Sequence, residues 1–205
     1  MLKKMPKPVS PPIQSLWALV GLLLTIGGNF LEAFATNPPW AWTGQGLKAV
    51  SLGVTYQIGA GLLTGCLGGA KAGALSQIAY IVVGLTWLPV FNQGGGWDYV
   101  KTPGFGYILG FVPGAWVCGW LAFRVVPRLE SLAFSAFCGL LTVHFYGVAY
   151  LLIFHYTKTV QVTDSKAISL SEALLRYSVY PLPGQLAIVC AVAVLSFFLR
   201  RLMFY

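Results

Sequence analysis

Six long apolar runs, separated by short polar or glycine-rich turns, most constrain how this chain of 205 residues can fold. A helix that crosses the hydrocarbon core of a bilayer needs roughly 20 apolar residues. The runs have about this length and lie near positions 15–35, 52–70, 72–91, 104–123, 132–154 and 180–199. They predict an all-α integral membrane protein, in which residues 1–205 form a single membrane domain with a six-transmembrane-helix bundle.

Charged side chains are too scarce to cover a water-soluble globule. They make up 9% of the residues, whereas soluble domains carry about 25%. In a soluble protein, the formal net charge of +8 would indicate nucleic acid as a partner. In a membrane protein it reflects topology, so we exclude nucleic acid and expect the lipid bilayer to surround the chain.

The distribution of Lys and Arg predicts the orientation, because both collect in the cytoplasmic loops of membrane proteins. With both termini cytoplasmic, eight of the thirteen basic residues lie inside: Lys3, Lys4, Lys7, Lys71, Arg124, Arg128, Arg200 and Arg201. The five that lie outside are Lys48, Lys101, Lys158, Lys166 and Arg176. We therefore expect a multi-pass protein of the cell (inner or plasma) membrane with cytoplasmic termini.

The first apolar run fits two interpretations. Its basic start, its apolar core and the small residues Ala33 and Ala35 also fit the outline of a secretory signal peptide. Cleavage there would remove one helix from a helical bundle and would release no exported soluble domain. We therefore favour a membrane-spanning helix.

No residue set for catalysis, metal binding or a cofactor is recognisable. The segment Gly65–Lys71 looks like a phosphate-binding loop, but Ala70 replaces its second glycine and Ala72 replaces the Ser or Thr that holds Mg²⁺. The two histidines, His144 and His155, have no acidic partner at helical spacing. The four cysteines are widely spaced within apolar runs. We expect no enzyme, no metal site and no cofactor.

Neutral polar side chains within the apolar runs indicate a small-molecule site instead. They are Asn29, Gln57, Gln77, Tyr80 and Gln185. Such donors and acceptors suit a small polar ligand in a mostly apolar pocket, whereas an ion path or a proton relay needs buried carboxylates. His144 also lies in an apolar run, where it is either a functional residue or a neutral, hydrogen-bonded packing residue.

Several short motifs in and between the apolar runs form a recognisable pattern. The most specific are Gly73-Ala74-Leu75-Ser76, Tyr80, Gly84, Leu88-Pro89-Val90-Phe91 and Gly106-Tyr107-Ile108-Leu109-Gly110-Phe111. Weaker ones are Val54-Thr55-Tyr56-Gln57, His144 with Gly147, Ser169-Leu170-Ser171-Glu172-Ala173 and Pro181-Leu182-Pro183-Gly184. Together they resemble the BioY family, the substrate-binding S components of biotin uptake systems of the energy-coupling factor type. The resemblance covers about residues 50 to 190.

The resemblance implies a substrate pocket near the outer side and, in most systems, a transmembrane coupling subunit with two cytoplasmic ATPases. Two departures concern the sixth helix. The family has an aspartate and a lysine that serve the biotin pocket, and this chain has Gln185 and Ile188 at those positions. The first helix also lacks a clean Ala-xxx-Ala docking face, for which Gly21 and Thr25 are the nearest equivalent.

We therefore expect a membrane substrate-binding subunit for biotin or a related small vitamin-like carboxylate. The expected ligand-binding residues are Gln57, Tyr80, Trp87, Asn92, Tyr107, His144 and Gln185. The alternative is a structural or accessory subunit of a larger membrane complex that keeps the BioY fold and no longer binds biotin. The missing lysine and aspartate favour this alternative, and the glycine-rich loop at positions 94–96 opposes it.

Overall fold

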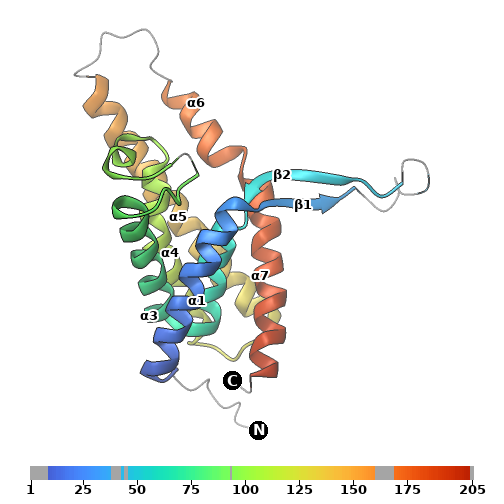
Figure 1. Ribbon diagram of the computed structural model, residues 1–205. Helices are drawn as coiled ribbons and strands as arrows, with labels where there is room; N and C mark the ends of the chain where they lie inside the picture. The colour runs from blue at the N-terminus through green and yellow to red at the C-terminus, as the bar shows by residue number, and fades with distance from the viewer. Residues whose placement is uncertain (1–8, 38–42, 44–45, 93, 160–168, 204–205) are drawn as a thin grey trace.

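Long apolar helices packed side by side make up most of the structure (Figure 1). The structure is a computed structural model that describes residues 9–37, 43, 46–92, 94–159 and 169–203. Its helices are α1 (Pro11–Phe30), α3 (Gln57–Thr86), α4 (Phe105–Ala122), α5 (Leu129–Thr159), α6 (Leu170–Leu174) and α7 (Leu182–Leu202), with a 3-10 helix η2 (Trp97–Lys101) and a π-helical turn η3 (Leu175–Val179). Five helical stretches within the described part are long and apolar enough to cross a membrane.

Helix α3 folds back on itself at Gly69, which separates its two halves. The φ angle of Gly69 is 85°, a left-handed conformation that side chains with a Cβ disfavour. The side chains of Gln57 and Tyr80 meet across the turn at 2.8 Å, and a Cβ on Gly73 would lie 3.1 Å from Cα of Gly65. Both pairs are centred on residue 69, so the two halves run antiparallel. The sequence predicted this turn two residues later, at Lys71.

Arg200 caps the C-terminal ends of two helical segments at one end of the bundle. Its side chain is only 1% exposed, although the sequence marks it as a charge that ends the last apolar run. Nε donates to the Cys66 carbonyl at 2.7 Å, and Nη1 donates to the Ala122 carbonyl at 2.9 Å. Carbonyls in the last turn of a helix have no partner within the helix. The guanidinium therefore satisfies the end of α4 and the end of the first half of α3.

The expectation of an all-α protein is wrong between α1 and α3, where two strands form an antiparallel hairpin. Strand β1 (Glu32–Thr36) pairs with β2 (Ala49–Thr55), and the pair projects sideways from the bundle (Figure 1). The segment around β2 is rich in β-branched residues, which favour strands. Gly53, with φ 64°, also interrupts any helix there. The apolar runs predicted at 15–35 and 52–70 therefore each include part of a strand.

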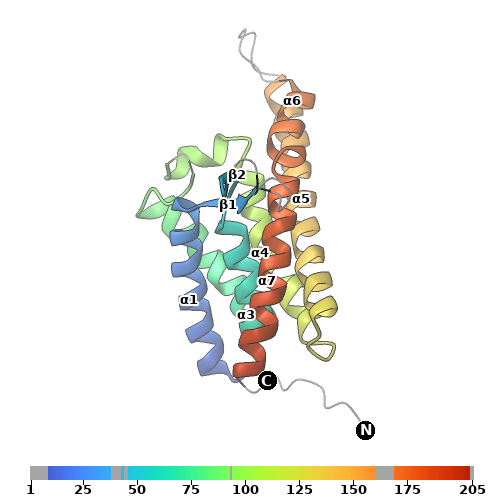
Figure 2. The ribbon, with the colours of Figure 1, turned by 90° about the vertical axis from the view of Figure 1, so that its right-hand side faces the viewer.

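The helices pack in the order α1, α3, α4, α5 and α7, and α7 also contacts α3. Gly21 and Thr25 face inward: Thr25 is fully buried, and a Cβ on Gly21 would lie 2.5 Å from Oγ1 of Thr64 on α3. The small-residue face of α1 is thus used within the bundle. Helix α1 begins and α7 ends at the same end of the molecule, and the hairpin and α6 lie at the other (Figure 2).

Candidate ligand-binding site

A cavity of about 500 Å³ opens at the end of the bundle that carries the hairpin. Sites for small organic ligands have volumes of about 300–1,000 Å³. Its lining residues come from α1, the hairpin, α3, the loop that follows α3, α4 and the start of α7. They are Asn29, Phe30, Glu32, Gly53, Val54, Thr55, Gln57, Ile58, Asn92, Phe111, Pro181 and Gln185. Four of these side chains are amides, which combine hydrogen-bond donors and acceptors in one group.

One chain of hydrogen bonds holds the amide of Gln185 on α7. His144 on α5 places Nε2 2.7 Å from Oε1 of Gln185 and Nδ1 3.3 Å from Oγ of Ser178 in η3. The same Ser178 hydroxyl lies 2.5 Å from the hydroxyl of Tyr107 on α4. The Tyr107 ring packs edge-on against the imidazole with the ring centroids 5.8 Å apart. Three helices and η3 therefore fix one side chain of the cavity.

The bond between His144 and Gln185 has a defined donor and acceptor. Oε1 of Gln185 can only accept, so Nε2 of His144 carries its proton there. Nδ1 lies within hydrogen-bond distance of the Ser178 hydroxyl, which also bonds the Tyr107 hydroxyl, and either oxygen of that pair can be the donor. The Gln185 amide nitrogen has no hydrogen-bond partner among the described residues, so its two N–H groups are available to a ligand.

A second set of hydrogen bonds holds two other lining residues, Gln57 and Asn29. Gln57 Nε2 donates to the Tyr80 hydroxyl at 2.8 Å, and this hydroxyl donates to the Val90 carbonyl at 2.8 Å. Asn29 Nδ2 donates to the same carbonyl at 3.0 Å. Asn29 is 5% exposed, and its Oδ1 is buried without a hydrogen-bond partner in the described part. An unpaired buried acceptor is costly, and here the Asn29 amide is held by its Nδ2 bond to the Val90 carbonyl.

Ile188, at the position of the family's lysine, does not line this cavity. Its side chain is 3% exposed, and a Cβ on Gly59 of α3 would lie 2.6 Å from its Cγ2. It lines instead an apolar groove of about 330 Å³ bounded by α1, α3 and α7. Position 188, which is a lysine in the family pattern, is therefore an apolar residue that packs between helices in this chain.

The structure brings together most of the expected ligand-binding residues. Gln57, Asn92 and Gln185 line the cavity directly. Tyr80 and His144 each bond one of these residues, and Tyr107 reaches His144 through Ser178. Trp87 is different, because it ends α3 with 85% of its surface exposed and lies outside the cavity lining.

Several lining or supporting residues were missed as ligand-binding residues by the sequence interpretation. Asn29 and Glu32 stood out as polar residues in or beside the first apolar run, which was a usable signal. Phe111 is one of thirteen phenylalanines in the chain, and Ser178 is a serine that follows a tyrosine, so neither differs in the sequence from other residues of its type. No local pattern distinguishes these two, since their role depends on which helices meet.

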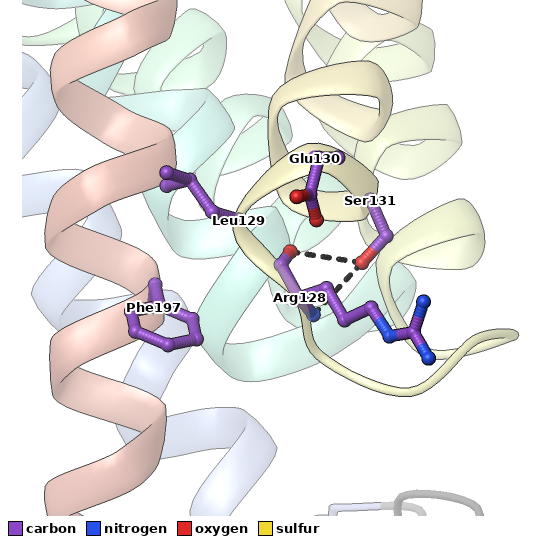
Figure 3. A pocket seen from close by; sticks show the side chains of 5 residues that line it. All are labelled: Arg128, Leu129, Glu130, Ser131 and Phe197. Carbon is purple, nitrogen blue, oxygen red and sulfur yellow. Dashed lines mark hydrogen bonds between the residues drawn. The ribbon is translucent and has the colours of Figure 1, made fainter.

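A second, wider depression of about 690 Å³ lies at the opposite end, between the start of α5 and α7 (Figure 3). Ser131 is its main uncharged polar side chain, and this hydroxyl is already used at the beginning of α5. It accepts from the Arg128 amide at 3.0 Å and donates to the Arg128 carbonyl at 2.9 Å. Its other polar lining side chains are the charged residues Arg128 and Glu130, so this depression lacks the neutral amides of the first cavity.

Taken together, the fold and the cavity define a class: a mostly helical, multi-pass membrane protein with an amide-lined cavity at one end. Residues 40–204 match the family model of the BioY family. The chain belongs to the BioY family and is a multi-pass protein of the plasma membrane.

Individual relatives agree with this assignment. The uncharacterized 21.2 kDa protein of the psbX-ycf33 intergenic region of Cyanophora paradoxa is 26% identical over 92% of this chain and 95% of that protein. The probable biotin transporter BioY of Lysinibacillus sphaericus is 42% identical over 48% of this chain, and the match covers 51% of that transporter. The chain thus matches about half the length of this transporter.

A solved structure has the same fold. The crystal structure of the S-component for biotin from an ECF-type ABC transporter superposes with a TM-score of 0.66, covering 92% of this chain and 90% of that one. The sequence identity is 18%, so this likeness concerns the fold.

Proposed function

We propose that this chain is the biotin-binding S component of an energy-coupling factor transporter. It acts by binding and releasing its ligand, not as an enzyme. The amide-lined cavity is the observation that carries the proposal, because the ring urea of biotin has one carbonyl acceptor and two N–H donors. The N–H groups of Gln185 complement the carbonyl, and the amide oxygens of Gln57 and Asn92 are acceptors for the N–H groups. Phe111, Val54 and Ile58 supply apolar surface for the fused rings.

The proposed orientation places this cavity on the outer side of the membrane. We infer six membrane passes, since the two antiparallel halves of α3 count separately, and both termini then lie in the cytoplasm. Lys71, Arg124 and Arg201 all lie at or near helix ends on the proposed cytoplasmic side. This distribution supports the orientation, because Lys and Arg favour cytoplasmic loops.

The proposed partners are a transmembrane coupling subunit and its cytoplasmic ATPases. Uptake requires the binding subunit to release its ligand to the cytoplasm, and this chain has no recognisable nucleotide-binding motif that would supply energy. The structural neighbour is an S-component from an ECF-type ABC transporter, and its likeness to this chain supports such an assembly. Copurification of the chain from its native membrane identifies these subunits directly.

Titration of the purified full chain in lipid nanodiscs with biotin tests the proposal. Saturable binding to one site per chain is expected. The variant Gln185→Leu should bind much more weakly, whereas Gln14→Leu, an amide near the start of α1 whose Nε2 donates to the Val9 carbonyl, should bind normally. The absence of saturable binding at high micromolar biotin would contradict the proposal and favour an accessory subunit that keeps only the fold.

A further inference from the structure

The described lining of the cavity carries one charged side chain, and that charge is negative. Among the twelve lining residues, it belongs to Glu32. Glu32 begins strand β1, and its Oε1 accepts a hydrogen bond from the hydroxyl of Ser51 on the paired strand β2. The carboxylate is solvent-exposed, and this bond to the hairpin orients it at the cavity.

Basic side chains at this end of the described structure lie outside the lining. Lys48 and Arg176 are exposed and are not lining residues, and Lys101 is paired with Asp98 at 2.8 Å. His144 is not a lining residue, and its two ring nitrogens contact Gln185 and Ser178. No described lysine, arginine or histidine thus lines the cavity to receive an anionic group.

Free biotin brings an anion to this site, because its valeryl tail ends in a carboxylate at neutral pH. The carboxylate of Glu32 repels that anion, and the open cavity screens the repulsion only in part. A ligand with the same fused rings but an amide at the end of the tail avoids this cost. The apolar and amide groups that contact the rings are the same for both ligands.

We propose that this site selects ureido ligands whose tail carboxyl is neutralised, as in a biotin amide, over free biotin, and that Glu32 is the specificity-determining residue. This inference rests on the proposed function of the cavity. The substrate class is then biotin derivatives whose tail carboxyl is linked as an amide.

Parallel titrations of the nanodisc-embedded chain with biotin and with biotinamide test the proposal, because the two ligands differ mainly in the charge of the tail. Biotinamide should bind roughly five- to tenfold more tightly, as expected for two like charges a few ångströms apart in a hydrated site. The ratio should fall as salt concentration rises. In Glu32→Gln, which keeps an acceptor for Ser51, it should approach one, and the control Glu130→Gln at the opposite end should leave it unchanged.

The outcomes separate this inference from the proposed function. Equal or tighter binding of biotin would overturn the selectivity while supporting the biotin site. A preference for biotinamide that persists in Glu32→Gln would overturn the role of Glu32. If neither ligand binds, the proposed function itself fails and the selectivity fails with it.

Discussion

Nε2 of His144 lies 2.7 Å from Oε1 of Gln185, although the two residues are 41 positions apart in the sequence. This hydrogen bond joins α5 to the start of α7 and sets which face of the Gln185 amide meets the cavity. It explains how a glutamine can serve a ligand site at a position where the family has an aspartate. The hydrogen bond to His144 keeps the amide in a fixed orientation.

Replacing His144 by Phe should weaken biotin binding by roughly tenfold, because the Gln185 amide loses the partner that orients it. Phe keeps the edge-on packing against Tyr107, so the protein should remain folded. Titration in nanodiscs measures the effect. The control His155→Phe changes a histidine about three turns further along α5, and equal losses in both variants would contradict the role of His144.

Replacing Ser178 by Ala should cause a smaller loss of affinity than His144→Phe and should leave the proton on Nε2 of His144. The hydroxyl of Ser178 lies between the Tyr107 hydroxyl and Nδ1 of His144, so its loss removes one of the two contacts that orient the ring. Oε1 of Gln185 remains as the acceptor for Nε2. Titration in nanodiscs measures the affinity, and nitrogen-15 NMR of labelled histidine reports the proton. A loss as large as that of His144→Phe, or a proton that leaves Nε2, would contradict this role.

Replacing Arg200 by Leu should lower the free energy of unfolding by about 2–4 kcal/mol, because two buried carbonyls lose a charged donor. Ligand affinity should change little, since Arg200 lies at the end opposite the cavity. The exposed neighbour Arg201 provides a matched control, and Arg201→Leu should leave stability nearly unchanged. Thermal and denaturant unfolding in detergent compare the two, and similar losses would contradict the helix-capping role.

Replacing Gly69 and Gly27 by alanine should have opposite effects on the stability of the protein. Gly69→Ala forces a Cβ into a left-handed backbone and should cost about 1–2 kcal/mol. Gly27→Ala should stabilise α1 by up to about 1 kcal/mol, because the space around Gly27 is open and alanine is the better helix former. Melting temperatures measured in detergent should fall for Gly69→Ala and rise for Gly27→Ala. A stable Gly69→Ala variant would argue against the turn that separates the halves of α3.

The helices were predictable because their signal is local. An apolar run of the right length in a chain with few charges has few stable alternatives in a bilayer. The hairpin was missed because the same hydrophobicity that predicts a helix at 52–70 also suits strand β2. The conformation of Gly53 and the pairing of Glu32 with Thr55 decide the structure there, and both depend on tertiary contacts.

The candidate site was only partly predictable. Gln57 and Gln185 stood out because polar groups are costly in apolar runs. The direction of each side chain was not accessible from the sequence: Trp87 ends its helix facing outward, and Ile188 faces the apolar groove. Position 188 looked like the loss of a pocket charge, and in the structure a lysine there would be buried among apolar side chains. Ile188→Lys alone should therefore destabilise the protein.

Protection of a thiol introduced by Thr55→Cys, a lining residue with no assigned ligand contact, tests most directly that biotin occupies this cavity on the outer side of the membrane. The substitution is combined with Cys138→Ala and Cys190→Ala, which leaves the buried Cys66 and Cys118 as the native thiols. A membrane-impermeant maleimide added outside intact cells should label the introduced thiol, and saturating biotin should slow the labelling. Labelling from the cytoplasmic side only, or at a rate that biotin does not change, would contradict the account.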